Sequence, residues 1–428
     1  MINFAVGTPG PGLIPKGDID DAVAEALSSN PDPLIYQYAK IEGTAAWREA
    51  LAGFLREQGA MHLTADHLCA TFGNSLALAS IAKTLARPGQ CAIVEHPTYF
   101  LAGKMFTDAG LRCVRCAVDA LGMEVDKLQD WLASTDVKPA LVYCVPRHHN
   151  PTSVSLDPAR HAKLLELAEK HDFTVVYDDP YRLLKFPGAP GALEFCTPHR
   201  RLITLASFSK ILTPGLRLGW IESTPENIRA VAQDGALNSG GGPANLITEA
   251  VRIMIQNCAL ARHLDGLRQT LSARHDALRE AVAKHLPGRV VCRQADGGYF
   301  VYLYLMRASS GRGSTALPAG FTTSGLRAFC DETGAGVAFM PASRCCVSQF
   351  VGAGEPGFGE VCAAAMCRES CVHACLLACV VLGVCLEWVF AAAGGSRCRA
   401  RALAACPQQV SGYDGGWGEG GRKRCCHT

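Results

Sequence analysis

Apolar runs rich in β-branched residues alternate with amphipathic stretches between residues 65 and 225. Short apolar runs predict strands, and apolar positions that recur every three or four residues predict helices. The alternation predicts an α/β sheet that is largely parallel and covered by helices on both faces. Binding residues should then lie on loops at the carboxyl ends of the strands. The predicted strands are Cys91–Glu95, Ala140–Val145, Thr174–Tyr177, Leu202–Ala206 and Leu218–Ile221, and the helices between them include Ser75–Ala86, Asp126–Ala133 and Pro158–Lys170.

The pattern changes after the predicted sheet. Residues 243–286 predict two long helices with a break near Ala259, and the run GGYFVYL at residues 297–303 predicts a strand that enters a second, smaller domain. We therefore expect an N-terminal segment over residues 1–39 that packs with the small domain. A large domain should follow over 40–240, and the linking helices and the small domain should occupy 241–345.

The last part of the chain, residues 346–428, is an atypical tail rich in Cys, Gly and Ala. Its stretch Ala374–Ala393 is apolar apart from one acid, Glu387. Three interpretations stay open for it: a buried helix, a membrane span, or a segment that is not natively folded. The Gly-rich end GGWGEGGRKRCCHT is typical of disorder.

Composition excludes several classes of protein. The net charge is +2, from 41 Lys and Arg against 39 Asp and Glu, and no dense basic run precedes the RKR near the C-terminus. We therefore expect no nucleic-acid partner. The start MINFAVGTPGPGL lacks the pattern of a secretory signal, and the cysteines before residue 300 lack metal-ligand spacing. We expect a cytoplasmic protein with no metal site and no membrane partner, in which these cysteines and the loop residues His148 and His149 are not ligands.

The run SFSKILTPGLRLGW, from Ser207 to Trp220, follows a predicted strand and carries the most specific chemistry. A lysine at a strand end can form a Schiff base with a carbonyl cofactor, and here that lysine is Lys210. The guanidinium of Arg217 and the hydroxyls of Ser207 and Ser209 suit a phosphate. Pyridoxal phosphate (PLP) needs both kinds of group. The run resembles the lysine signature of the class I and II aminotransferases, which are fold type I PLP enzymes; the simpler alternative is a surface lysine beside a strand.

Further motifs follow the order of the same family, and the resemblance covers residues 1–345. The segment YQYAKIEGTAAWREAL carries Tyr38 and Gly43 and resembles the family element Y-x4-G-x3-[LW]-R. The resemblance implies a homodimer in which Tyr38 reaches the cofactor phosphate of the other subunit. An aromatic contact before a helix is the alternative for Tyr38.

The segment TFGNSLALAS opens a predicted helix, and a helix N-terminus is a ready anion site. The resemblance implies that Asn74 and Ser75 hold the phosphate, although both are also common N-caps. In HPTYF, the resemblance implies that Tyr99 stacks on the pyridine ring; a plain core tyrosine is the alternative.

Two more motifs supply polar side chains for the ring. In YCVPRHHNPTSVSL, the resemblance implies that Asn150 donates to the phenolic oxygen, but Ser153 stands where the family has glycine, which reaches conformations that serine resists. In VVYDDPYRLL, it places Asp178 against the pyridine nitrogen and Tyr181 against the phenolic oxygen. A nearby carboxylate favours the protonated ring. Asp179 is the alternative acid, and the three-residue spacing to Tyr181 selects Asp178.

Substrate contacts are expected at the two ends of the chain. The start MINFAVGTPGPGLIP resembles the aminoadipate and kynurenine aminotransferase branch, in which Gly7 would line the substrate pocket. Family members clamp the substrate carboxylate with an arginine in an L-R-L-S-F-type strand. That pattern is missing from the tail, so we assign the carboxylate to Arg368, although Glu369 follows it where an apolar residue is expected.

Together these features predict a PLP-dependent aminotransferase that moves an amino group from an amino acid to a 2-oxo acid through a Schiff base on Lys210. Two alternatives stay open. One is an impaired or non-catalytic PLP-binding member of the fold that lacks the carboxylate arginine. The other is a different PLP enzyme, such as a C–S lyase or a decarboxylase, because these share the same motifs.

Overall fold

The structure is a computed structural model, and it describes residues 7–29, 33–190, 198–287 and 290–305 together with strands at 2–4, 337–341 and 360–364. Within these ranges no helix is both long and apolar enough to cross a membrane. The stretch Ala374–Ala393 and the tail residue Arg368 lie outside the described residues.

A large sheet of eight strands forms the body of the molecule, in the order β2-β9-β8-β7-β6-β3-β4-β5. The five neighbouring strands β8, β7, β6, β3 and β4 are parallel, whereas β9 and β5 run antiparallel to β8 and β4. The prediction of a largely parallel sheet is therefore confirmed. The bounds are β2 (Leu68–Thr71), β3 (Cys91–His96), β4 (Arg112–Asp119), β5 (Gly122–Met123), β6 (Pro139–Cys144), β7 (Thr174–Asp178), β8 (Leu202–Ser207) and β9 (Gly219–Glu222).

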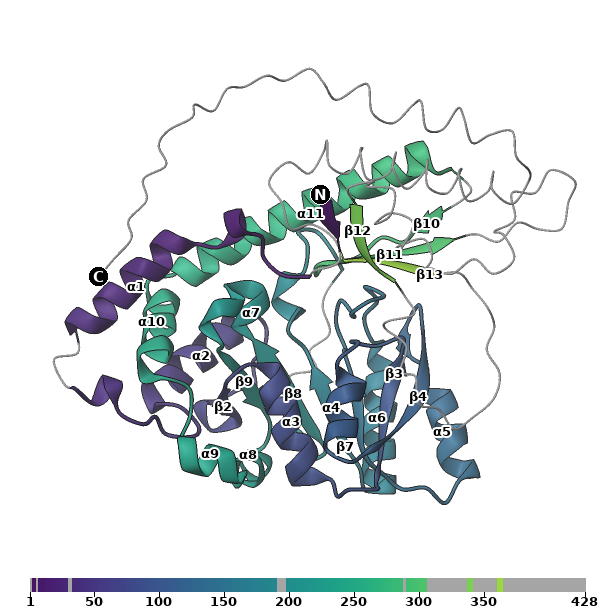
Figure 1. Cartoon of the computed structure of the whole chain (residues 1–428), viewed down its shortest axis with the longest axis horizontal. Helices are drawn as coiled ribbons and strands as arrows, with labels where there is room; N and C mark the ends of the chain where they lie inside the picture. The colour runs from purple at the N-terminus through teal and green to yellow at the C-terminus, as the bar shows by residue number, and fades with distance from the viewer. Residues whose placement is uncertain are drawn as a thin grey trace, which may run out of the picture.

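Helices cover both faces of this sheet (Figure 1). Successive residues on a strand point to opposite faces, so Val142 and Val175 join one buried cluster while Tyr143 and Val176 join the other. Burial on both faces explains why the central strands are continuous apolar runs. The helices of this part are α2 (Ala45–Glu57), α3 (Asn74–Leu85), α4 (Ala102–Asp108), α5 (Val125–Ser134), α6 (Pro158–His171), α7 (Phe208–Ile211), α8 (Pro225–Val231) and α9 (Gly235–Gly240), and the 3-10 helices are η3 (Ala65–His67), η4 (Arg182–Leu184) and η5 (Pro214–Leu216).

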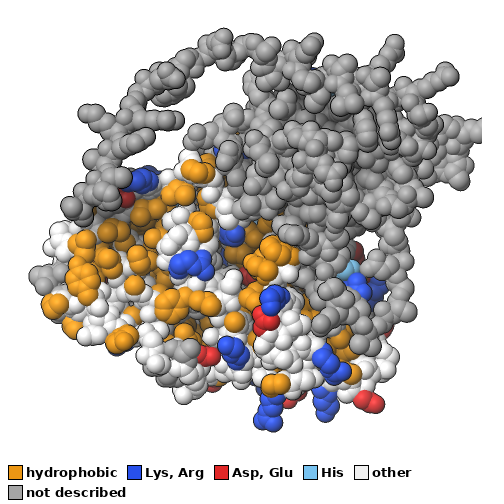
Figure 2. Space-filling model, viewed as in Figure 1, with side chains coloured by type: hydrophobic (Ala, Val, Ile, Leu, Met, Phe, Trp, Pro, Cys, Tyr) orange, Lys and Arg blue, Asp and Glu red, His pale blue; other side chains and the backbone are white. Residues whose placement is uncertain are grey.

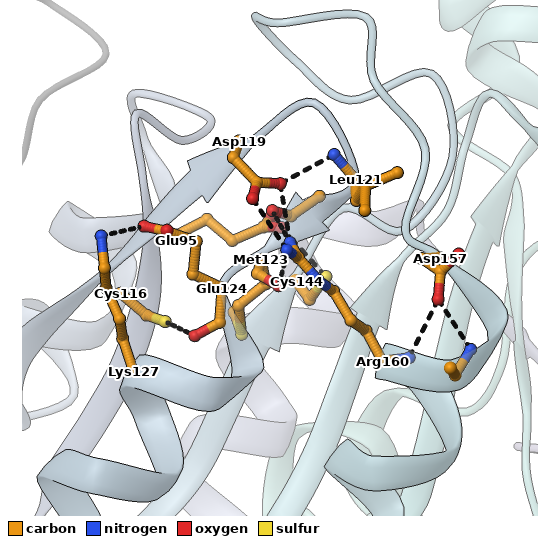
Figure 3. Close-up of polar contacts among 12 residues, drawn as sticks. Glu95, Cys116, Asp119, Leu121, Met123, Glu124, Lys127, Cys144, Asp157 and Arg160 are labelled. Atoms are coloured by element: carbon orange, nitrogen blue, oxygen red, sulfur yellow. Dashed lines mark hydrogen bonds and ion pairs between the residues drawn. The ribbon is translucent and has the colours of Figure 1, made fainter.

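The edge of the sheet at β4 and β5 is held by one arginine of α6. The Arg160 guanidinium donates to both carboxylate oxygens of Asp119 at 2.7 Å and to the carbonyls of Gly122 and Met123 at 3.0 Å (Figure 3). These bonds lower the pKa of Asp119. Asp157 is the N-cap of helix α6, because its side chain accepts hydrogen bonds from two backbone N–H groups of the first turn.

Two long helices lead from the large sheet to a smaller one. α10 (Asn245–Gln256) and α11 (Ala259–His285) are separated at Cys258, which adopts a left-handed conformation with φ of 60°. This agrees with the break predicted near Ala259. The remaining helical elements are α1 (Lys16–Ser29), η1 (Pro11–Leu13) and η2 (Pro33–Tyr36).

The smaller sheet has five strands in the order β1-β12-β13-β11-β10. β1 pairs in parallel with β12, so the N-terminal segment adds a strand to this sheet. β13 lies within the segment predicted as an atypical tail, and it pairs with both β11 and β12. The bounds are β1 (Ile2–Phe4), β10 (Val290–Cys292), β11 (Phe300–Leu305), β12 (Val337–Pro341) and β13 (Glu360–Ala364).

Candidate active site

Lys210 follows the carboxyl end of β8. Ser207 ends this buried strand and caps α7, because its Oγ accepts from the Ser209 N–H at 3.0 Å. The Lys210 Nζ donates to the Gly7 carbonyl at 2.7 Å, and the Tyr299 hydroxyl donates to the Lys210 carbonyl at 2.9 Å. The lysine therefore lies where the large sheet meets the N-terminal segment and the start of β11.

Asp178 is the last residue of β7 and is buried. Its Oδ1 accepts from the Asn74 side-chain amide at 2.6 Å, and its Oδ2 accepts from the Tyr143 hydroxyl at 2.8 Å. Burial raises the pKa of Asp178 above its ordinary value, and the two hydrogen bonds and the positive charge of Lys210 offset only part of that rise. Each carboxylate oxygen thus has a donor that favours the charged form.

The neighbouring acid, Asp179, has a different partner. Its Oδ2 accepts from the Arg147 Nε at 2.9 Å and from a second nitrogen of the same guanidinium. Burial raises the pKa of Asp179, and the Arg147 charge lowers it. Asp178 therefore contacts Asn74 and lies near Lys210, whereas Asp179 forms a buried ion pair with Arg147.

A positively charged corner lies at the N-terminus of α3. Gly73 caps this helix with φ of 88°, and a Cβ there would lie 3.1 Å from the Arg217 Nη2. The same Nη2 donates to the Phe72 carbonyl at 3.3 Å. A guanidinium and the partial positive charge of a helix N-terminus therefore converge next to the exposed residue Ser75.

Tyr99 connects this corner to the buried carboxylate. Burial raises the pKa of Tyr99 most, the negative charge of Asp178 raises it further, and a hydrogen bond with the Ser75 side chain lowers it. The ring thus lies near both Ser75 and Asp178. It is partly buried and packs against the core, edge-on to Phe100.

Aromatic side chains form a wall beside the lysine. The Tyr181 ring meets the Phe300 ring edge-on, with centroids 5.3 Å apart. A Cβ on Gly7 would lie 2.7 Å from the Phe300 ring, so only glycine fits there without a shift. The wall therefore brings together three segments that are far apart in the sequence.

Asn150 lies on the loop that follows β6 and is partly buried. Ser153, which stands where the sequence motif has glycine, adopts φ of 63°. Its Oγ donates to the Phe300 carbonyl at 2.5 Å. Serine thus takes the left-handed conformation that glycine would adopt, and it adds a bond to β11.

Comparison with known proteins identifies the family. The family model for aminotransferase class I and II matches residues 1–375. The chain belongs to the class I and II aminotransferases. Aromatic-amino-acid aminotransferase 1 of Thermococcus litoralis is 31% identical over 310 residues, which cover 71% of this chain and 74% of that protein.

Solved structures of aminotransferases share the fold. Kynurenine aminotransferase of Pyrococcus horikoshii is 27% identical with a TM-score of 0.75, over 89% of this chain and 90% of that one. Alpha-aminoadipate aminotransferase of Thermus thermophilus is 25% identical with a TM-score of 0.76, over 92% and 93%. The predictions of a fold type I PLP enzyme and of a transaminase are confirmed: the chain is a PLP-dependent transferase that moves amino groups.

The residues of the site fit PLP. Arg217 and the α3 N-terminus offer positive charge for a phosphate, and Asp178 offers a buried carboxylate for a pyridine nitrogen. Lys210 offers an amine of the kind with which the cofactor forms a Schiff base. Gly73 leaves the corner beside Arg217 open, since a side chain there would crowd the guanidinium.

Two predicted residues of this aminotransferase are not placed with the others. Tyr38 is 78% exposed, and among the described residues its backbone N–H donates to the neighbouring Gln37 side chain and not to any of the others. Arg368 lies beyond β13 and outside the described residues. The dimer role of Tyr38 and the carboxylate role of Arg368 therefore stay predictions.

The structure gives one motif residue a different contact from the one expected, and it adds residues that the motifs did not indicate. Asn74 was expected at the phosphate, but its side chain binds Asp178. Tyr143 lies inside the buried strand β6, and its hydroxyl donates to Asp178. A buried tyrosine hydroxyl needs a hydrogen-bond partner, and this need was the one indication of its contact in the sequence. Nothing in the sequence around Arg147 or Tyr299 indicated a place near the site.

The two histidines before Asn150 are both buried. His149 Nε2 lies 3.1 Å from a Glu95 carboxylate oxygen, and its Nδ1 contacts the Thr152 hydroxyl at 2.9 Å. Burial lowers the pKa of His148 to about 3, with Arg147 adding to the effect. Among the described residues, no group of three His, Cys, Asp or Glu side chains could hold a metal ion.

Proposed function

We propose that Lys210 is the residue to which PLP attaches and that it moves the proton during transamination. The observation that carries the proposal is the position of its Nζ, 2.7 Å from the Gly7 carbonyl and within the electrostatic influence of Asp178. When bound, PLP supplies an electron sink for the carbanion at the substrate α-carbon. The Lys210 amine would take the proton from that carbon as a general base and would later donate it as a general acid.

Asp178 would hold the pyridine nitrogen in its protonated form. Its two oxygens are already fixed by Asn74 and Tyr143, so the carboxylate does not have to reorient when the ring binds. Asn150 and Tyr181 would both donate to the phenolic oxygen. Asn150 would thereby also border the substrate.

The phosphate would lie at the α3 N-terminus. We assign its contacts to the backbone at Asn74, the hydroxyls of Ser75, Ser207 and Ser209, and the guanidinium of Arg217. Tyr99 would stack on the pyridine ring, since its own ring lies near both Ser75 and Asp178. Gly7, with Phe300 behind it, would line the substrate pocket and exclude water from Lys210.

The substrate α-carboxylate needs a cation, and we assign this role to Arg368. Two buried arginines of the described residues, Arg147 and Arg182, are already paired with Asp179 and Glu222. Arg368→Ala should therefore weaken amino-acid binding and leave PLP binding unchanged. A turnover that the substitution leaves intact would place the anchor elsewhere.

We propose further that the active unit is a homodimer to which Tyr38 contributes across the interface. Hydrophobic side chains gather on the side of the molecule that carries α1 and α10 (Figure 2). Large apolar side chains around η2 are exposed, and they include Leu34, Tyr36 and Tyr38. An exposed apolar patch of this kind favours a partner surface. Mixing inactive Lys210→Ala with Tyr38→Phe should restore activity through hybrid sites, whereas a fully active monomer would exclude the dimer.

We place the enzyme in the cytoplasm. Seven cysteines among the described residues are free, which suits a reducing compartment. Fractionation of cells that express the tagged chain tests this location, and recovery of the protein with membranes would contradict it.

Purified protein tests the proposed chemistry. It should show a visible absorption band with PLP, and the band should change when a donor amino acid is added. Lys210→Ala should abolish the wild-type band and the turnover. A variant that retained both would show that another lysine carries the chemistry.

A further inference from the structure

The loop that carries Asn150 and the turn that carries Asp178 and Tyr181 are joined by one buried ion pair. β6 and β7 are neighbouring parallel strands, so the segments that follow them leave the same edge of the sheet. Arg147 comes three residues after β6, and Asp179 comes directly after β7. Their side chains are 5% and 0% exposed.

The geometry of this pair restrains both segments. The Arg147 guanidinium donates through its Nε, at 2.9 Å, and through a second nitrogen to the same Asp179 oxygen. Two donors from one rigid guanidinium fix direction as well as distance. The Asp179 backbone is fixed too, since its N–H donates to the Leu205 carbonyl of β8 at 2.8 Å.

We propose that Arg147 and Asp179 are positioning residues that set the distance between Asn150 and Tyr181. This distance determines how strongly both residues hydrogen-bond to the phenolic oxygen of PLP. This rests on the proposed function, which assigns that oxygen to Asn150 and Tyr181. Asn150 lies three residues after Arg147, and Tyr181 lies two residues after Asp179. A slip between the two segments would move the two donors apart.

The same turn carries a second buried ion pair, which serves as the matched control. Arg182 donates to both oxygens of Glu222, which also accepts from the Trp220 Nε1 at 2.6 Å. This pair is as buried as the first, but it ties the turn to β9, which carries none of the assigned ring contacts. Loss of either pair leaves a buried arginine without its partner, and only the first joins the two phenolic-oxygen donors.

The test uses binding without catalysis. Deoxypyridoxine phosphate has the ring hydroxyl but no aldehyde, so it cannot bond covalently to Lys210, and a second probe is the same molecule without that hydroxyl. The ratio of the two dissociation constants measures how much the hydrogen bonds to the phenolic oxygen contribute to binding. Calorimetry on the cofactor-free protein should give a preference of about 10- to 100-fold for the hydroxyl probe, as for hydrogen bonds to a charged group.

Asp179→Asn should reduce this preference to below about 3-fold, whereas Glu222→Gln should keep the wild-type ratio. Should Asp179→Asn fail to fold, Arg147→Met combined with Asp179→Leu removes both charges and leaves no buried charge unpaired. This double variant should lose the preference in the same way.

The outcomes separate the two claims. A wild-type ratio in the Asp179 variants, or an equal loss in Glu222→Gln, would overturn the positioning role and leave the proposed function intact. A wild-type protein that binds neither probe, or that shows no preference for the hydroxyl, would instead overturn the proposed function.

Discussion

The two ends of the proposed cofactor site are built differently. At the phosphate end, Ser75 and Arg217 are exposed, and the attraction comes from a guanidinium and a helix N-terminus. At the ring end, Asp178, Asp179 and Arg147 are 7%, 0% and 5% exposed, and each has a named partner. Exposed charges interact weakly and are screened by salt, whereas buried charges must be paired before the ligand arrives.

The difference shows how stability and function are divided in this enzyme. A substitution at the phosphate end should change cofactor affinity and little else. At the ring end, the result should depend on whether the removed group leaves a charge buried and unpaired. Substitutions at the two ends test this division.

Asp179→Ala should destabilise the protein by about 3–5 kcal/mol, because it leaves the Arg147 guanidinium buried without its carboxylate. Urea unfolding measures the loss. Asp66→Ala is the control, since Asp66 is 83% exposed at 3.6 Å from Arg48 and should change stability by less than about 1 kcal/mol. Equal stability of the two variants would contradict the account.

Asp178→Ala should slow turnover by about 100- to 1000-fold while the protein stays folded and keeps some cofactor. Its partners Asn74 and Tyr143 are neutral, so no unpaired charge is left behind. Steady-state kinetics and a melting curve separate the two effects. If folded Asp179→Ala showed the large loss in turnover and Asp178→Ala did not, the assignment would be wrong by one residue.

The strands of this fold could be predicted closely from the sequence, because burial on both faces makes them continuous apolar runs. Predicted Leu202–Ala206 and Cys91–Glu95 correspond to β8 and β3 with one residue added to each. In the large sheet, β2, β4 and the two-residue β5 were not among the predicted strands. β2 has four residues, and β4 carries Arg112 and Arg115, which interrupt its apolar pattern.

The candidate site could be predicted only in part, for a physical reason. Motif residues such as Lys210 and Asp178 are recognised from their neighbours in the chain. The contacts Tyr143–Asp178 and Arg147–Asp179 depend instead on β6 lying next to β7 and on the direction of side chains that are more than thirty residues apart. No local sequence pattern indicates that these strands are neighbours. For the same reason, the motif around Asn74 did not predict that its side chain donates to Asp178 instead of pointing to the proposed phosphate site.

Arg217→Ala should weaken PLP binding by about 10- to 100-fold, since a charge-assisted hydrogen bond to the phosphate would be lost. The affinity of the variant should also depend less on salt than that of the wild type. Titration of cofactor-free protein at two salt concentrations measures both. A large fall in the melting temperature without cofactor would contradict the proposed division, because Arg217 is exposed.

Tyr143→Phe should reduce turnover by about 5-fold, the value of one hydrogen bond of about 1 kcal/mol to the Asp178 carboxylate. Tyr177→Phe is the matched control. Its hydroxyl is equally buried but contacts His161 at 2.8 Å, in the cluster on the other face of the sheet. Both variants should lose similar stability, and only Tyr143→Phe should lose turnover; equal turnover in the two would remove Tyr143 from the site.

Lys210 at the end of β8 is the proposed point of attachment of the cofactor. Reduction of the PLP-loaded protein with borohydride, followed by peptide mapping by mass spectrometry, tests it most directly. The account predicts a phosphopyridoxyl group on the peptide that contains Lys210 and on no other. A modification mapped to another lysine, or reduced protein that carries no adduct, would contradict it.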